Sequence, residues 1–71
     1  MTRAEHVRWC KQRAKEYLPG DPKEALTSMM SDLEKHPDTA GLASSLGMLF
    51  LFEMQKNSAV SAQKFIDGFA E

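Results

Sequence analysis

The feature that most constrains this 71-residue chain is a sharp corner around Gly20-Asp21-Pro22. Glycine takes positive φ at little cost, so Gly20 can end a helix. Asp21 can cap a following helix, Pro22 suits its first position, and Glu24 falls where a capping box has an acid. The sequence therefore predicts two helices that meet at this corner and fold back on each other.

The first two helices have single apolar stripes. Thr2 and Glu5 have capping-box spacing, so the first helix is expected from Arg3 to Leu18. The second is expected from Pro22 to about Lys35, where Pro37 ends it. The helical spacing predicts these apolar stripes: Val7, Cys10, Ala14, Tyr17 and Leu18 on the first helix, and Ala25, Leu26, Met29, Met30 and Leu33 on the second.

A third helix is expected to start at Asp38 or Thr39 and to reach about Gln55. Its second half is apolar on nearly every side, which is typical of a buried helix, so this helix is expected to be central. A strand of five or six residues is the alternative for the run Met48–Phe52, but the chain offers it no partner strand.

A fourth helix is expected from about Ala59 to Phe69, capped by Asn57 or Ser58. The predicted fold is therefore all-α: one domain over residues 1–71, with four short helices arranged as two consecutive antiparallel helical hairpins.

Composition narrows the setting. The net charge of −1 gives no overall attraction to nucleic acid or anionic membranes. Cys10 is the only cysteine, so no internal disulfide is possible and a reducing compartment fits. The residues after Met1 do not form an apolar signal core, and the run Met48–Phe52 is far shorter than the ~20 residues of a membrane span. We expect a cytoplasmic protein with no membrane association.

Neither catalysis nor metal binding is predicted. His6 and Cys10 are four residues apart on one helix face, but a metal site would need His36 and Asp38 to converge on them. A nucleophilic Cys10 would need a lowered pKa and an oxyanion hole, and no motif supplies the latter. We therefore expect no enzymatic activity and no cofactor. Cys10 is interpreted as buried and His6 as solvated, and the following carboxylates are interpreted as caps or solvated groups: Asp21, Glu24, Asp32, Glu34 and Asp38.

The first helix is basic although the chain is not. It holds five of the nine lysines and arginines, namely Arg3, Arg8, Lys11, Arg13 and Lys15. Trp9 lies among them and has two interpretations: a core residue beside Gly47 or Ala43, or an exposed anchor next to Arg8. As candidate partner-binding residues we take Trp9, Arg8, Lys11 and Arg13. The alternative hypothesis is that this helix grips phosphates and stacks a base of a nucleic acid.

Self-association is a separate prediction. The third and fourth helices carry more apolar surface than their neighbours readily cover. The candidate residues for contact between copies are Leu51, Phe52, Phe65 and Phe69.

At a period of about 34 residues the chain resembles two tetratricopeptide-type helical hairpins. The first unit has Trp9, the turn Gly20-Asp21, the small residue Ala25 and the closing Pro37. The second has Leu46-Gly47 followed by Phe50, and then Ala59, and the resemblance covers about residues 7–66. It implies a helical scaffold that binds protein partners.

The chain is also similar to small uncharacterised proteins of tailed bacteriophages. Three blocks carry this similarity: Ser31–Thr39, Leu46–Met48 and Phe65–Phe69. It implies a phage origin, with the host cytoplasm as the compartment. Taken together, the expected function is a small non-enzymatic protein-interaction module that binds a host or virion protein.

Overall fold

The structure is a computed structural model, which describes residues 2–71. These residues form five helices and no strand, so the all-α prediction is confirmed and the predicted number of helices is wrong. The helices are α1 (Arg3–Lys15), α2 (Pro22–Leu33), α3 (Pro37–Ser45), α4 (Gly47–Lys56) and α5 (Ala59–Asp67).

Local capping explains where several helices begin. Thr2 and Glu5 form the predicted capping box at the start of α1. The Asp21 carboxylate accepts a hydrogen bond from the Glu24 amide, and proline follows Asp21 at the first position of α2. Ser58 caps α5 in the same way through the Ser61 amide. These three helix starts agree with the sequence-based predictions.

The corner between α1 and α2 exists but is built differently from the prediction. α1 ends at Lys15, and turns occupy residues 16–20. Within residues 2–71 no glycine has positive φ, so the left-handed conformation predicted for Gly20 is wrong. The corner is closed instead by the Asp21 amide, which donates to the Tyr17 carbonyl at 2.7 Å. The peptide bond between Leu18 and Pro19 is cis.

Pro37 begins a helix instead of ending one. α2 stops at Leu33, and Pro37 occupies the first position of α3, where its missing N–H costs nothing. The cap of α3 is His36, whose Nδ1 accepts a hydrogen bond from the Asp38 amide at 3.1 Å. Asp38 and Thr39, the predicted starting residues of this helix, therefore lie inside its first turn.

The predicted third helix is two helices that meet at Leu46. This residue has φ −102° and ψ 10°, outside helical geometry, and it is followed by Gly47. Two serines precede it, so the break is flanked by weaker helix formers, Ser44, Ser45 and Gly47. Tertiary packing therefore bends the chain where the intrinsic helix propensity is weakest.

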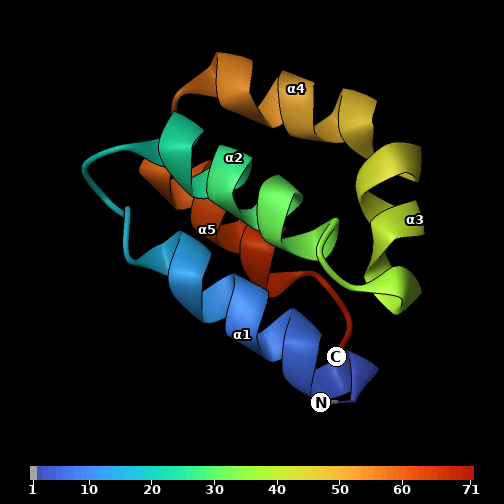
Figure 1. Cartoon of the computed structure of the whole chain (residues 1–71). Coiled ribbons are helices and arrows are strands. Elements are labelled where there is room, and N and C mark those ends of the chain that lie inside the picture. The colour runs from blue at the N-terminus through green and yellow to red at the C-terminus, as the bar shows by residue number, and fades with distance from the viewer. Residues whose placement is uncertain (1) are drawn as a thin grey trace.

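The expectation that the apolar helix is central is also wrong. α2 is the element that packs against every other helix. α4 lies along the outside of the bundle, at the top of the view in Figure 1, and contacts α2, α3 and α5. The buried apolar cluster is formed by Cys10, Ala14, Ala25, Leu26, Met29, Leu33, Ala43, Phe50, Ala62 and Ile66. Tyr17, expected in the stripe of the first helix, is 39% exposed.

None of the helices in residues 2–71 has the length and apolar character that crossing a membrane requires.

Candidate functional site

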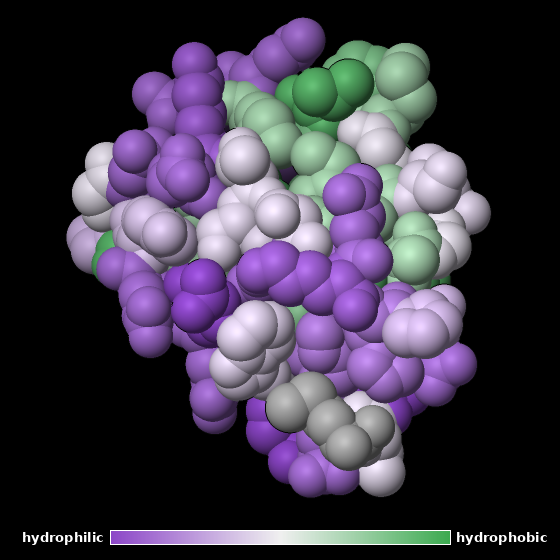
Figure 2. Space-filling view, viewed as in Figure 1, coloured by the Kyte–Doolittle hydropathy of each residue, from purple (hydrophilic) through white to green (hydrophobic). Residues whose placement is uncertain are grey.

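The outer surface of α4 is apolar and exposed. Met48 is 65% exposed, Leu49 51%, Leu51 51% and Phe52 55%, and we call these four residues the α4 face. Phe50, between them in sequence, is fully buried. At 100° per residue, Met48 and Phe52 lie on the same side of the helix, opposite Phe50. Figure 2 shows hydrophobic side chains gathered at the top of the molecule, where Figure 1 places α4.

An aromatic cluster holds α4 in this orientation. The Phe50 ring packs edge-on against Phe65, with ring centroids 5.1 Å apart, and lies 5.7 Å from Phe69. Phe65 and Phe69 make a third edge contact at 5.5 Å. Such contacts add stability beyond the area they bury. Phe50 therefore anchors one side of α4 to α5 and leaves the opposite side facing solvent.

A polar contact at the end of α4 supports the same orientation. Glu53 accepts hydrogen bonds from Lys56 and from the Ser61 hydroxyl on α5, each at 2.9 Å. Burial alone would raise the pKa of Glu53, but these hydrogen bonds outweigh burial and leave the pKa below its usual value. The ionised carboxylate thus ties α4 to α5.

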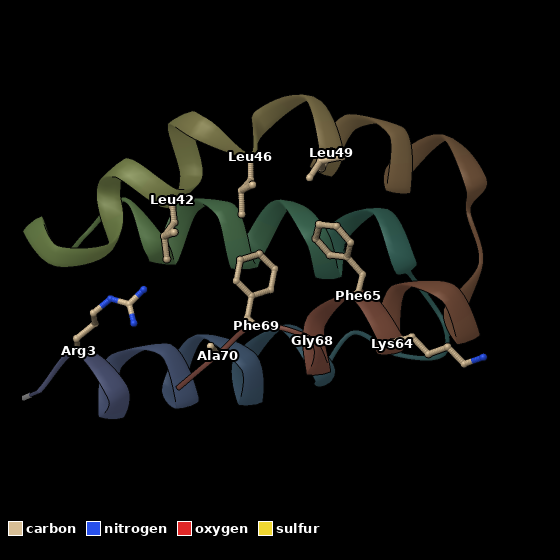
Figure 3. Close-up of a pocket in the computed structure, with 9 residues that line it drawn as sticks. All are labelled: Arg3, Leu42, Leu46, Leu49, Lys64, Phe65, Gly68, Phe69 and Ala70. Atoms are coloured by element: carbon tan, nitrogen blue, oxygen red, sulfur yellow. The ribbon is translucent and has the colours of Figure 1, made fainter.

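Beside the α4 face lies a groove of about 420 Å³. Figure 3 shows Leu42 and Leu46 pointing down from α3 and the break, with Phe65 and Phe69 pointing up toward them. Arg3 lies at one end and Lys64 at the other. The full lining is Arg3, Leu42, Leu46, Leu49, Lys64, Phe65, Gly68, Phe69 and Ala70, and we call this site the α3–α5 groove.

The four residues predicted for self-association divide between these two surfaces. Leu51 and Phe52 belong to the exposed α4 face, whereas Phe65 and Phe69 are partly buried in the wall of the α3–α5 groove. Sequence reasoning missed Leu49, which lies in both surfaces. Leu49 belongs to the apolar run Met48–Phe52, but the sequence does not show which side of this helix is buried. Its exposure becomes clear only once Phe50 is known to face the core.

Two of the predicted partner-binding cations are bound to the C-terminal residues. The Arg8 Nε donates to Glu71 at 2.7 Å. The Lys11 side chain is nearly buried and its Nζ donates to Glu71 and to the Asp67 carbonyl, both at 3.3 Å. Hydrogen bonds from Arg8 and then Lys11 lower the pKa of Glu71. These contacts fasten the C-terminal residues onto α1.

The other two predicted partner-binding residues are joined to each other. The Arg13 guanidinium lies 4.9 Å above the Trp9 ring and donates to Asp32 at 2.8 Å. The hydrogen bond with Asp32 raises the pKa of Arg13. Asp32 also accepts from Lys35 at 3.0 Å, and its side chain is only 3% exposed. Its interpretation as a cap or a solvated acid is therefore wrong.

Trp9 is half-buried and packs against the core. The His6 ring stacks on it, with the ring centroids 5.6 Å apart. A side-chain carbon at Gly47 would meet no atom within 4 Å, so Trp9 does not fill that space. Trp9 is therefore packed on the core, as one interpretation has it, but not beside Gly47.

The pair His6 and Cys10 is buried, so the interpretation of His6 as solvated is wrong. The His6 Nε2 donates to the Asp32 carbonyl at 2.9 Å and lies 3.6 Å from the Cys10 sulfur, and its ring stacks on His36 at 4.9 Å. Burial raises the pKa of the Cys10 thiol to about 11. The thiolate that nucleophilic attack or metal ligation requires is therefore scarce at neutral pH.

The buried polar side chains of the described residues are satisfied within the molecule. Over residues 2–71 every buried side-chain nitrogen or oxygen has a hydrogen-bond partner. In the same range no group of three or more His, Cys, Asp or Glu side chains is placed to hold a metal ion. The exposed apolar side chains of residues 2–71 lie chiefly at the α4 face, beside the α3–α5 groove.

In comparisons with known proteins, no family model, no curated protein and no solved structure matches this chain.

Proposed function

We propose that this chain is a small non-enzymatic protein-interaction module that self-associates through the α4 face. The observation that carries the proposal is the exposure of Met48, Leu49, Leu51 and Phe52, each at least half open to solvent on one ten-residue helix. Single exposed apolar residues are ordinary, but a contiguous patch marks an interaction site.

The size of the patch supports this proposal. Taking about 200 Å² for each large side chain, the α4 face exposes roughly 400 Å² of apolar surface. A standard interface buries about 800 Å² per partner. The α4 face therefore supplies about half of such an interface, and flanking polar residues such as Gln55 would supply its rim.

A second copy of the chain is a suitable occupant. The α4 face carries no charged side chain between Met48 and Phe52, and the net charge of −1 gives two copies little mutual repulsion. A two-fold axis level with Phe50, between Leu49 and Leu51 along the helix, would place two α4 helices antiparallel against each other, so that Phe52 of one copy meets Met48 of the other. Such an isologous contact is the commonest way to close a dimer.

The two resemblances found in the sequence suggest which class of protein binds as a further partner. The likeness to paired tetratricopeptide-type hairpins supports a scaffold that binds a protein segment, although here the second unit contains the break at Leu46. The likeness to proteins of tailed bacteriophages supports a host or virion protein as the target, met in the host cytoplasm.

Sedimentation equilibrium over about 5–200 µM tests self-association, since ordinary homodimers have affinities in this range. We expect wild type to approach twice the mass of one chain and Phe52→Asp to stay monomeric. The matched control is Val60→Asp, because Val60 is 68% exposed on α5, outside the α4 face. A monomeric wild type, or equal loss of association in both variants, would remove the proposal.

Nucleic-acid binding through α1 has less support. Arg8, Lys11 and Arg13 each hold a carboxylate of this same chain, so binding phosphate would cost those ion pairs. Titration with mixed-sequence DNA and RNA at low salt decides the matter: we expect no binding. Binding that weakens by orders of magnitude as salt rises would favour the nucleic-acid alternative instead.

A further inference from the structure

We propose that the α3–α5 groove is the docking site for an acidic amphipathic helix of a partner protein. This inference rests on the proposed function as an interaction module and names the chemistry of its partner. The groove shares Leu49 with the α4 face but does not include Phe52, so a change at Phe52 can remove self-association and leave the groove lining intact.

The groove has the character of a helix-binding site. Its volume of about 420 Å³ falls within the range of ligand sites, roughly 300–1,000 Å³. Leu42, Leu46 and Leu49 line one side, and Phe65 and Phe69 line the other. Helix-in-groove recognition inserts apolar anchors spaced i, i+3 or i+4 and i+7 into a groove of this kind.

The walls of the groove are held in place before any partner arrives. Phe65 and Phe69 each pack on the fully buried Phe50, which fixes their rings relative to α4. A site that needs little ordering on binding keeps more of its contact energy as affinity.

Charge selects the partner. Among residues 2–71, the charged residues in the lining are Arg3 and Lys64, both cations, and no carboxylate lines the groove. Within residues 2–71, six of the nine lysines and arginines pair with carboxylates of the chain, and the other three are Arg3, Lys23 and Lys64. Two of these three cations without a carboxylate partner thus lie at the ends of the α3–α5 groove.

The separation of the two cations favours a helix over a small amphiphile. Figure 3 places Arg3 and Lys64 at opposite ends of the apolar lining, with the Lys64 ammonium pointing outward on a flexible stem. A partner helix with an acidic residue on each side of two or three apolar anchors would engage both cations at once. A single anionic head group, such as that of a fatty acid, would engage one of them.

The experiment uses a synthetic peptide of about 18 residues, long enough for useful helicity. Its leucines are spaced i, i+4 and i+7, glutamates stand at both ends, and a twin peptide carries lysine in place of every glutamate. Fluorescence anisotropy of the labelled peptides measures binding to the full chain. We expect the acidic peptide to bind at least 10-fold more tightly than the twin.

Charge reversal locates the site. Arg3→Glu and Lys64→Glu should each weaken the acidic peptide several-fold, and the double variant should come to prefer the lysine twin. Lys23→Glu is the matched control and should bind like wild type, because Lys23 is exposed on α2 outside the groove lining. An acid at position 3 lies in the first turn of α1, where the helix dipole favours it, so the variant is expected to fold.

Three outcomes would overturn the inference. The first is a twin peptide that binds wild type as tightly as the acidic one, and the second is a parallel titration in which only dodecanoate binds. The third is loss of self-association in Arg3→Glu and Lys64→Glu, which would assign the groove to a second copy. Repeating the titration on Phe52→Asp separates the two proposals: peptide binding that persists there supports the groove even if wild type proves monomeric.

Discussion

Phe50 and Phe52 are two residues apart on α4, and the structure assigns them opposite roles. Phe50 is fully buried and makes two aromatic contacts, with Phe65 and Phe69, whereas Phe52 is 55% exposed on the α4 face. Replacing each by alanine removes the same atoms from the same helix. The two variants are therefore a matched pair that separates folding from binding.

The cost of Phe50→Ala is large for so small a chain. Truncating a buried phenylalanine costs about 3–5 kcal/mol, from lost apolar transfer and from the cavity left behind. At about 0.05–0.15 kcal/mol per residue, the whole chain is stable by only about 4–11 kcal/mol. Each kcal/mol shifts the melting temperature by about 4–8 °C in a domain of this size, so we expect Phe50→Ala to melt at least about 12 °C lower or to be unfolded.

The cost of Phe52→Ala to the monomer is small. Less than half of a side chain with roughly 200 Å² of surface is covered, and alanine keeps part of that cover. At about 25 cal/mol per Å², the loss is about 1 kcal/mol. What Phe52→Ala should remove is the concentration dependence of melting, because a dimer at ten times its Kd gains about 1.4 kcal/mol over the monomer.

The assay is thermal melting by circular dichroism at about 1 µM and about 200 µM, on either side of an ordinary homodimer Kd. At 1 µM we expect Phe52→Ala to melt within about 8 °C of wild type and Phe50→Ala far below both. At 200 µM the wild type should gain several degrees and Phe52→Ala should gain none. Equal destabilisation of the two variants at 1 µM, or a wild-type melting temperature that ignores concentration, would refute the reasoning.

The remaining predictions concern the polar contacts. Asp32→Asn removes a buried carboxylate held by two cations and should cost about 1–3 kcal/mol in urea unfolding; an unchanged midpoint would contradict the assigned ion pairs. Cys10 should resist a thiol-reactive disulfide reagent at pH 8 in the folded chain and react after unfolding, and fast native reaction would contradict its burial and its pKa of about 11. Arg8 and Lys11 lower the pKa of Glu71 from 4.5 in the folded chain. Below pH 4.5 the unfolded state therefore binds more protons than the folded state. The free energy of unfolding should thus decrease as the pH is lowered from 4.5 to the pKa of Glu71 in the folded chain. A carboxyl titration by NMR checks this, and a Glu71 pKa at or above 4.5 would contradict the contact to α1.

The local signals in the sequence were sufficient to predict several helix starts. Thr2, Asp21 and Ser58 each cap a helix as predicted, because capping depends on residues within one turn. The all-α class follows from the same signals together with apolar periodicity. What they did not predict is the break at Leu46, which depends on how the neighbouring helices pack.

The position of α4 could not be predicted, because the composition of a helix does not determine which other helices pack against it. A helix apolar on all sides is usually central, but here α2 takes that place and α4 is covered on one side only. For the same reason the buried states of His6 and Asp32 were missed, since each depends on a residue far along the chain. The groove likewise depends on distant parts of the chain, since Arg3 and Lys64, 61 positions apart in sequence, lie at its two ends.

The most direct test of the account is to observe which residues of two copies touch. Mixing isotope-labelled and unlabelled chains at about 1 mM, well above an ordinary homodimer Kd, permits NMR detection of contacts between copies only. We predict intermolecular signals from the Met48 methyl group to Leu51 and Phe52 of the other copy. Intermolecular signals confined to other helices, or none at this concentration, would contradict the claim that α4 is the interface.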